Sequence, residues 1–224
     1  MIGITERGDA GQDFNWIAWT AQGKPAILIT KSPQNILPSD IGNSIVHCTI
    51  TGFGGTVLEP GVERPSVTLE AYRDLIGKYG PDRVVLRVDP VISTTKGLQV
   101  AASVISQAQG RVRISFIDAY PHVVSRFKTK DLSLPWTGLH APLAQREAAL
   151  KFLQGLTSFP IEICGEPGMA CTGCVSALDL QVLGLNAEGS RKGQRPACAC
   201  LAAKTELLST RGQCEHGCLY CYWK

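Results

Sequence analysis

The sequence predicts an α/β protein built on a parallel sheet, as either a partial (β/α)6 barrel or an open, doubly wound sheet. Short aliphatic or β-branched runs alternate six times with segments of helical periodicity, which is the pattern of consecutive βα units. Most of these runs are apolar along their whole length, as expected of strands that helices cover. Six units are fewer than the eight of a complete barrel.

The expected strands are Gly3–Glu6, Ala26–Thr30, Ile45–Thr51, Val84–Val88, Val112–Ile117 and Pro160–Cys164. The expected helices among them are Phe14–Ala21, Ser66–Tyr79, Gly97–Gln109 and Pro142–Leu156. The last has the clearest helical spacing of apolar residues. Further along the chain, two more helices are expected near Val175–Leu183 and Cys200–Leu208.

Polar side chains follow every expected strand. The carboxyl ends of parallel strands meet at one edge of a sheet, where α/β proteins bind their ligands. The sequence therefore predicts a pocket lined by these side chains, among them Glu6, Thr30, Thr51, Arg87, Asp89, Ser115, Asp118 and Glu162.

The composition suits one globular domain, or one domain with a small appendage. The chain has 224 residues, of which 44% are hydrophobic and 18% charged. No apolar run approaches the roughly 20 residues that span a bilayer, and the first residues do not resemble a signal peptide. We therefore expect a cytoplasmic protein without a membrane partner. The net charge of +3 permits a nucleic-acid partner without requiring one, and Arg191, Lys192 and Arg195 form the densest basic group.

The cysteines are concentrated in the last part of the chain. Cys48 stands apart, and the other eight of the nine follow residue 163. In a reducing compartment such a cluster favours metal binding over disulfides. We expect a partial barrel over residues 1–164 and a cysteine-rich, metal-stabilised segment over residues 165–224 that completes the top of the barrel.

Three cysteines near the C-terminus have the spacing of an iron–sulfur motif. Cys214, Cys218 and Cys221 can bind three irons of a [4Fe–4S] cluster and leave the fourth iron open to an external ligand. Gly217 allows a positive φ where this loop must turn. Zinc is the alternative, because Cys218 and Cys221 form a Cys-x-x-Cys pair that Cys214 or His216 could complete.

This motif, with the aromatic Tyr220 before its third cysteine, resembles that of the radical S-adenosylmethionine (SAM) superfamily. The chain also resembles a bacterial domain-of-unknown-function family whose C-terminal cysteines have been likened to that motif. Its Thr5–Asp9 segment departs from the family pattern and leaves the roles of Arg7 and Asp9 open. The matching stretches are Leu28–Pro33, Thr49–Gly54, Tyr79–Val84, Leu86–Pro90, Ile114–Asp118, Gln194–Arg195 with Cys198–Cys200, and Cys214–Tyr222.

The resemblance implies a radical SAM enzyme. A reduced cluster would cleave SAM to a 5′-deoxyadenosyl radical that abstracts hydrogen from the substrate, with flavodoxin or ferredoxin as the reductant. Tyr220 would flank the adenine, and the carboxylate of Glu6 would hold the SAM ammonium group. The remaining expected contacts to SAM and substrate are Thr51, Arg87, Asp89 and Ser115, of which Arg87 suits a carboxylate.

The motif lies at an unusual place in the chain, because radical SAM proteins usually carry it after the first barrel strand. A circular permutation would reconcile the two orders. Pro160–Cys164 would then be the ordinary first strand and Gly3–Glu6 the second.

Five cysteines remain for a second, auxiliary [4Fe–4S] cluster. The family pattern implies Cys164, Cys174, Cys198 and Cys200 as its ligands, with Cys171 as an alternate, while a zinc site on Cys171 and Cys174 is the rival. A nucleobase in DNA or RNA, isomerised or otherwise modified, is one candidate substrate, and a small amino-acid-like metabolite is another. The competing functions are an iron–sulfur electron carrier without SAM chemistry and a zinc-stabilised binding module.

Overall fold

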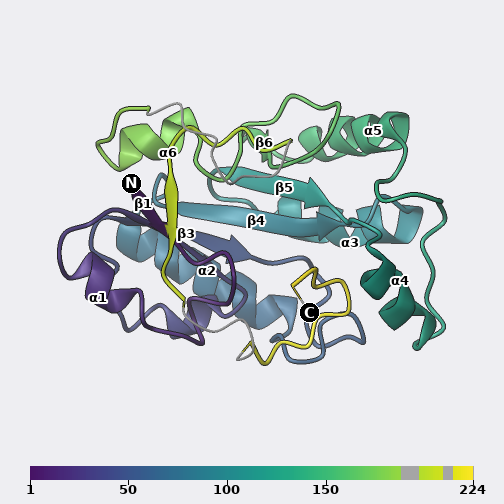
Figure 1. The fold of residues 1–224 in the computed structure, drawn as a ribbon, viewed down its shortest axis with the longest axis horizontal. Coiled ribbons are helices and arrows are strands. Elements are labelled where there is room, and N and C mark those ends of the chain that lie inside the picture. The colour runs from purple at the N-terminus through teal and green to yellow at the C-terminus, as the bar shows by residue number, and fades with distance from the viewer. Residues whose placement is uncertain (188–196, 209–213, 224) are drawn as a thin grey trace.

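A computed structural model describes residues 1–187, 197–208 and 214–223. Its seven strands are all parallel and lie in the order β6-β5-β4-β3-β2-β1-β7 (Figure 1). The sheet is open, with β6 and β7 at its edges. The strands are β1 (Ile2–Ile4), β2 (Ala26–Thr30), β3 (Ser44–Thr49), β4 (Val84–Val91), β5 (Val112–Phe116), β6 (Ile161–Ile163) and β7 (Lys204–Glu206).

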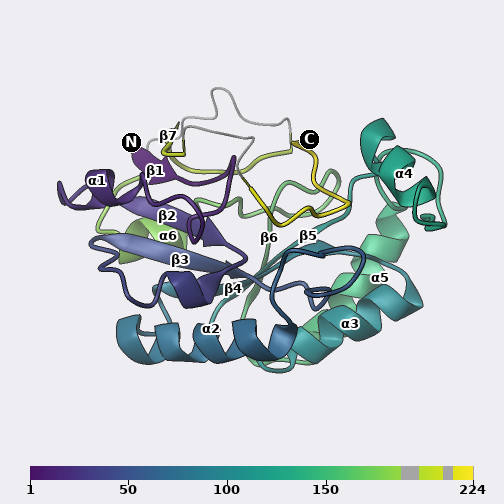
Figure 2. The same ribbon diagram turned by 90° about the horizontal axis from the view of Figure 1, so that it is seen from below.

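The strand order differs from that of a doubly wound sheet. Strands β1 to β6 are neighbours in chain order without a reversal, whereas a doubly wound sheet reverses at a switch point. The connections between successive strands have the same hand, and each one moves to the next strand in the same direction. The helices in these connections therefore lie on the same face of the sheet. Accordingly, α2 (Pro65–Tyr79), α3 (Thr95–Ile105) and α5 (Leu143–Gln154) all lie on one side of the sheet (Figure 2). The predicted parallel α/β architecture is confirmed.

Both faces of the sheet are buried, which explains the continuous apolar runs. On the helix-covered face, residues such as Leu86 and Ile114 belong to one core with Tyr72 of α2 and Leu153 of α5. On the opposite face, isoleucines of β1, β2 and β3 pack against the cysteine-rich segment, including Leu180 of α6 (Ala177–Val182). This segment therefore takes the place that a second layer of helices would occupy.

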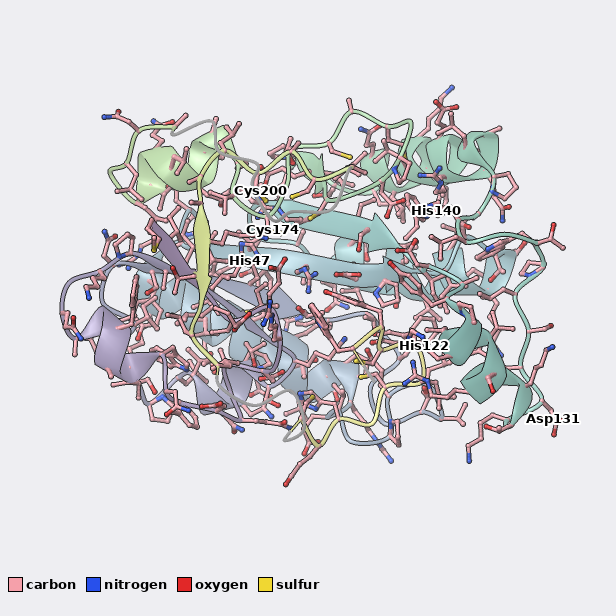
Figure 3. The ribbon with its side chains drawn as sticks, viewed as in Figure 1. His47, His122, Asp131, His140, Cys174 and Cys200 are labelled. Atoms are coloured by element: carbon pink, nitrogen blue, oxygen red, sulfur yellow. The ribbon has the colours of Figure 1, made fainter. Side chains whose placement is uncertain are left out.

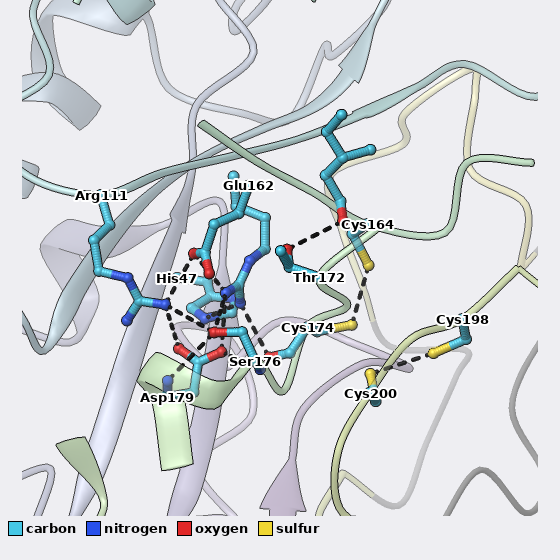
Figure 4. Close-up of polar contacts among 12 residues, drawn as sticks. His47, Arg111, Glu162, Cys164, Thr172, Cys174, Ser176, Asp179, Cys198 and Cys200 are labelled. Atoms are coloured by element: carbon cyan, nitrogen blue, oxygen red, sulfur yellow. Dashed lines mark hydrogen bonds and ion pairs between the residues drawn. The ribbon is translucent and has the colours of Figure 1, made fainter. Parts of the chain in front are cut away.

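A buried ion network fixes α6 to that opposite face (Figure 4). The Arg113 Nη2 atom lies 2.7 Å from Glu162 Oε2 and 2.9 Å from Asp179 Oδ2, and Arg111 Nη2 lies within 2.9 Å of the same two carboxylates. Asp179 also forms the capping box of α6 with Ser176. Because an unpaired buried charge is strongly destabilising, these pairs specify where α6 must lie.

The six predicted strands and the helix near Val175–Leu183 are confirmed. The predicted helix over Cys200–Leu208 is wrong, because this stretch contains β7, which pairs with the open edge of β1. Backbone pairing at an exposed strand edge overrides a weak local helical preference. The structure also adds α4 (Pro121–Lys128) and η1 (Pro33–Asn35), and α1 (Ile17–Thr20) is shorter than expected.

The prediction that Pro160–Cys164 is the first barrel strand, next to Gly3–Glu6, is also wrong. Strand β6 pairs with β5 at the far edge of the sheet, and β7 lies beside β1 instead. The reason is the connection that follows β6. It runs across one face of the sheet, includes α6, and adds β7 at the opposite edge, beside β1. The strand that leads into the C-terminal cysteines is therefore β7.

Two predictions from the composition concern the membrane and the basic group, and the described residues bear only on the first. No helix among residues 1–187, 197–208 and 214–223 has the length and apolarity to cross a bilayer. The basic group of Arg191, Lys192 and Arg195 lies outside the described residues.

Replacing Asp179 by Ala should lower the free energy of unfolding by about 3–5 kcal/mol, because it removes one of the two carboxylates that balance two buried guanidinium groups. Urea denaturation measures this change. The control is Asp74→Ala on the exposed side of α2, which should stay within about 0.5 kcal/mol of the unmodified protein. Equal effects of the two substitutions would contradict the role of the network.

The contribution of Asp179 should also depend on pH. Burial opposes ionisation, but Arg113, His47 and Arg111 outweigh it and lower the pKa of Asp179 to about 2. An unfolded aspartate has a pKa of about 3.9. A lowered folded-state pKa stabilises the protein above the unfolded value, and this stability is lost as the pH falls from about 4 to about 2. The stability difference between the unmodified protein and Asp179→Ala should shrink over that range in urea titrations.

Candidate metal and cofactor site

A pocket opens at the carboxyl ends of the strands, as the polar strand ends predicted. Its empty volume, including the open solvent at its mouth, is about 1090 Å³. Residues that follow β1 to β6 form its floor, and the C-terminal segment forms one wall. Glu162 was expected to line the pocket but pairs with Arg111 and Arg113 in the buried ion network instead.

All three C-terminal cysteines line this pocket. Gly217 has a φ of 62°, which confirms the tight turn expected between them. Burial raises the pKa of Cys218 to about 12. The charges of Glu59, Cys214 and Cys221 add to this rise, and the charge of Lys31 opposes it. The thiols are therefore close enough to repel one another as thiolates, and a bound cation would relieve that repulsion.

A buried ion pair anchors the loop that carries these cysteines. His216 Nε2 lies 2.7 Å from Asp9 Oδ2, and the two residues are only 2% and 4% exposed. Asp9 also accepts hydrogen bonds from the Thr30 hydroxyl and the Lys31 backbone, each at 2.6 Å. Burial lowers the pKa of His216, but its hydrogen bond and charge interaction with Asp9 raise it on balance. The pair therefore ties the loop to the ends of β1 and β2.

Gly61 provides the second anchor, from the loop between β3 and α2. Its N–H donates to the His216 carbonyl at 3.0 Å, and its carbonyl lies 3.1 Å from His216 Nδ1. A Cβ atom at this position would lie 2.4 Å from the Glu215 carbonyl oxygen. Only glycine lets the two backbones approach this closely. The indole of Trp223, which donates to the Glu6 carbonyl at 3.1 Å, holds the far end of the loop.

Tyr220 is fixed in the pocket wall by its hydroxyl group. Lys31 Nζ donates to that oxygen at 2.8 Å and to Glu59 Oε1 at 2.7 Å, and the tyrosine hydroxyl itself donates to Glu59. Burial lowers the pKa of Lys31, but the charges of Glu59 and Cys218 raise it on balance. A cation thus stands beside the cysteine loop. The role of Tyr220 beside an adenine stays a prediction.

The structure brings most of the other predicted ligand-binding residues to the same pocket. Glu6, Arg87, Asp89 and Ser115 all line it. The guanidinium of Arg87 pairs with Asp89, whose other oxygen accepts from Ser115. The carboxylate of Glu6 is held by Lys204, with N–O distances of 3.0 and 2.9 Å. Its proposed contact with an ammonium group stays a prediction.

Thr51 does not lie at the end of a strand that lines the pocket, where it was predicted. Strand β3 ends at Thr49, so that by Thr51 the chain has turned into a loop. The Thr51 hydroxyl accepts from the Phe53 backbone at 3.1 Å, and Thr51 is not among the residues that line the pocket. Thr49 lines the pocket instead.

The second set of cysteines is grouped as the family resemblance implied. The sulfur atoms of Cys164 and Cys174 are 3.4 Å apart, and those of Cys198 and Cys200 are 3.2 Å apart (Figure 4). Cys174 and Cys200 interact with each other as well (Figure 3). Cys171 instead contacts the backbone N and O of Glu166, each at 3.2 Å. The geometry therefore separates Cys171 from the other four.

The donor atoms fit a thiolate-bound metal, although neither cysteine set is arranged as a ready-made site for one ion. In the part of the chain that the structure describes, no three His, Cys, Asp or Glu side chains are placed to hold a single metal ion. The hydrogen bond between Cys198 and Cys200 lowers the pKa of Cys198 to about 7, against an opposing effect of burial. A thiol with this pKa is readily available as a thiolate ligand.

Several residues that matter to the site were not predicted. Asp9 had no assigned role, and Glu59 and Glu166 were not recognised. Glu166 lines the pocket, accepts from the Phe116 backbone at 2.7 Å and pairs with Arg146 at 2.9 Å. One signal in the sequence could have pointed to Asp9. It is the histidine inside the cysteine motif, because a buried histidine needs an acidic or carbonyl partner.

The fold and the site define a parallel α/β protein whose pocket is lined by the three motif cysteines and by Cys164 and Cys174 of the second set. The chain belongs to the family described as Domain of unknown function (DUF1848), whose model matches residues 19–223. This match confirms the predicted resemblance to a domain-of-unknown-function family. No curated protein and no solved structure matches the chain.

Replacing Gly61 by Ala should displace the cysteine loop, because the new methyl group would collide with the Glu215 backbone. We expect a lower melting temperature and faster labelling of Cys218, which is buried in the intact protein, by a thiol reagent mapped by mass spectrometry.

The matched control is Gly77→Ala, at a position of α2 with open space around it. It should stabilise the protein by up to about 1 kcal/mol, because alanine favours a helix over glycine, and leave the labelling of Cys218 unchanged. Unchanged labelling in Gly61→Ala would contradict the anchoring role of Gly61.

Proposed function

We propose that this protein is a radical SAM enzyme whose [4Fe–4S] cluster is bound by Cys214, Cys218 and Cys221. The observation that carries the proposal is that both ring nitrogens of His216, the other ligand candidate in the motif, are already engaged. Its two ring nitrogens contact Asp9 and Gly61, which leaves three thiols without a histidine to complete a tetrahedral zinc site. Three thiols at an open pocket suit a cubane with one iron free for an external ligand.

When bound and reduced, the cluster supplies the electron that splits SAM into methionine and the 5′-deoxyadenosyl radical, which takes a hydrogen atom from the substrate. The chain's own residues position the reactants. Tyr220, held by Lys31 and Glu59, offers a fixed ring for the adenine. Arg87 lies across the floor beside Asp89 and Ser115, where its planar group suits a carboxylate.

The strand arrangement supports a permuted partial barrel, with a first strand other than the one predicted. Strand β7 precedes the cysteine loop in the chain and lies beside β1 in the sheet. The resemblance places the motif after the first strand of a radical SAM barrel. We therefore assign β7 to that first place and β1 to the second, with β2 to β6 following in order.

We further propose that Cys164, Cys174, Cys198 and Cys200 bind an auxiliary [4Fe–4S] cluster. Their sulfur contacts support this assignment, and Cys164 and Cys174 line the same pocket as the motif cysteines. A nucleobase is the proposed substrate, and a cytoplasmic flavodoxin or ferredoxin is the proposed reductant. The second candidate function is an electron carrier, favoured by the presence of two cysteine sets in one chain, of which Cys164 and Cys174 line the pocket of the motif cysteines.

Anaerobic reconstitution with iron and sulfide should yield protein that forms 5′-deoxyadenosine from SAM and dithionite, measured by liquid chromatography. Cys218→Ala should abolish this product, because it removes one of the three ligands to the cluster. The control is Cys48→Ala, whose thiol lies in the core on the helix-covered face and which should retain the activity.

Three results would contradict the proposal. Iron–sulfur protein that forms no 5′-deoxyadenosine would indicate the electron carrier. Stoichiometric zinc in place of iron, or undiminished product in Cys218→Ala, would exclude the assigned cluster.

Iron analysis should separate the two cysteine sets. Full reconstitution should give about eight irons per chain, and replacing Cys174 and Cys200 together by Ala should leave about four. Cys171→Ala should keep about eight, because its sulfur is engaged by Glu166. A loss of iron in Cys171→Ala that matches the double variant would place Cys171 among the ligands.

A further inference from the structure

A row of aromatic rings lies along the wall of the pocket. The rings of Tyr120 and His122 are stacked, with centroids 5.6 Å apart and an interplanar angle of 11°. Tyr222 lies 6.4 Å from Tyr120 on one side and 4.8 Å from Trp223 on the other. The row thus joins the start of α4 to the segment that follows the last motif cysteine.

Three of the four rings belong to the pocket, and one of these three is exposed to solvent. Tyr120, Tyr222 and Trp223 all line the pocket, and Tyr222 is 40% exposed. Exposed aromatic surface in a concave site is typical of ligand contact. Tyr220 is a different kind of ring, because Lys31 and Glu59 fix its hydroxyl group.

Two arginines lie beside the row. The Arg7 guanidinium lies 5.8 Å from the centre of the Trp223 ring. Arg126 of α4 donates to the carbonyl of Cys221, the residue before Tyr222. Flat rings bordered by cations match a flat ligand that carries negative charge.

We infer that this row, Tyr120, His122, Tyr222 and Trp223, binds a nucleobase of a nucleotide or of a single-stranded nucleic acid. The inference rests on the proposed function, for which it names the substrate class. Every base has a π-face that stacks on aromatic side chains, and phosphates pair with flanking arginine and lysine. A base inside a duplex cannot offer its face to a pocket wall unless it is extruded. The ligand is therefore unpaired.

The test measures binding of a fluorescein-labelled short oligothymidylate by anisotropy, with cluster-free and with anaerobically reconstituted protein. Tyr222→Ala should weaken binding roughly 5- to 150-fold, the range that stacking of one base supports, whereas Tyr222→Phe keeps the ring and should bind within about twofold. The matched control is Phe152→Ala on α5, which removes another exposed ring (47% exposed) from the helix-covered side and should leave binding unchanged.

Thymidine monophosphate and the same oligonucleotide in a duplex distinguish the sources of the base. Equal affinity for the monophosphate and the single strand indicates a free nucleotide, and tighter binding of the single strand indicates nucleic acid; both results support the stacking site. Arg7→Ala should reduce the salt dependence of single-strand binding.

Three outcomes would overturn the inference: no binding of either ligand, equal binding of duplex and single strand, or equal effects of Tyr222→Ala and Phe152→Ala. Competitive displacement of the oligonucleotide by SAM would also overturn it, because the row would then serve the adenine of the cofactor. Formation of 5′-deoxyadenosine is measured separately. Its absence would overturn the proposed function, whereas absence of oligonucleotide binding would overturn only the inference about the substrate.

Discussion

The site depends on the docking of the C-terminal cysteine loop against the ends of the parallel strands. The buried pair of Asp9 and His216 provides the charge interaction, and Gly61 provides the close backbone contact. Either charged group alone would be unfavourable in this position, so each stabilises the other only when the loop is docked. The motif cysteines consequently reach the pocket through contacts that involve no thiol.

The order of the strands explains why so many chemical groups share one pocket. Seven parallel strands expose all their carboxyl ends at one edge, and β7 brings the cysteine loop to that edge beside β1. The connection from β6 to β7 crosses the other face of the sheet and carries the second cysteine set with it. The network of Arg111, Arg113, Glu162 and Asp179 holds this crossing in place. Cys174 and Cys200 of the second set lie near Glu6 and Lys204, and Glu6 also lines the pocket that the motif cysteines line.

The sequence predicted the features that depend on local pattern. Strands β2 to β5 were recognised because burial on both faces makes them rich in aliphatic residues, and Cys164, Cys174, Cys198 and Cys200 were grouped through the family resemblance. Long-range pairing was not recoverable in this way. Strand β7 has only three residues and exists because β1 offers an open edge. Asp9 and His216 are separated by 207 positions in the chain, and no periodicity links them. The misplacement of Thr51 has the same origin, because the point at which β3 turns into a loop depends on the packing that follows it.

The most direct test of the central claim is electron paramagnetic resonance of the dithionite-reduced protein before and after addition of SAM. The sample is the variant in which Cys174 and Cys200 are replaced by Ala, so that only the motif cysteines can hold a cluster. The account predicts the signal of a reduced [4Fe–4S] cluster whose g values shift when SAM binds the open iron. A sample without this signal, or a signal that SAM leaves unchanged, would contradict a cluster with an iron vacant for SAM at Cys214, Cys218 and Cys221.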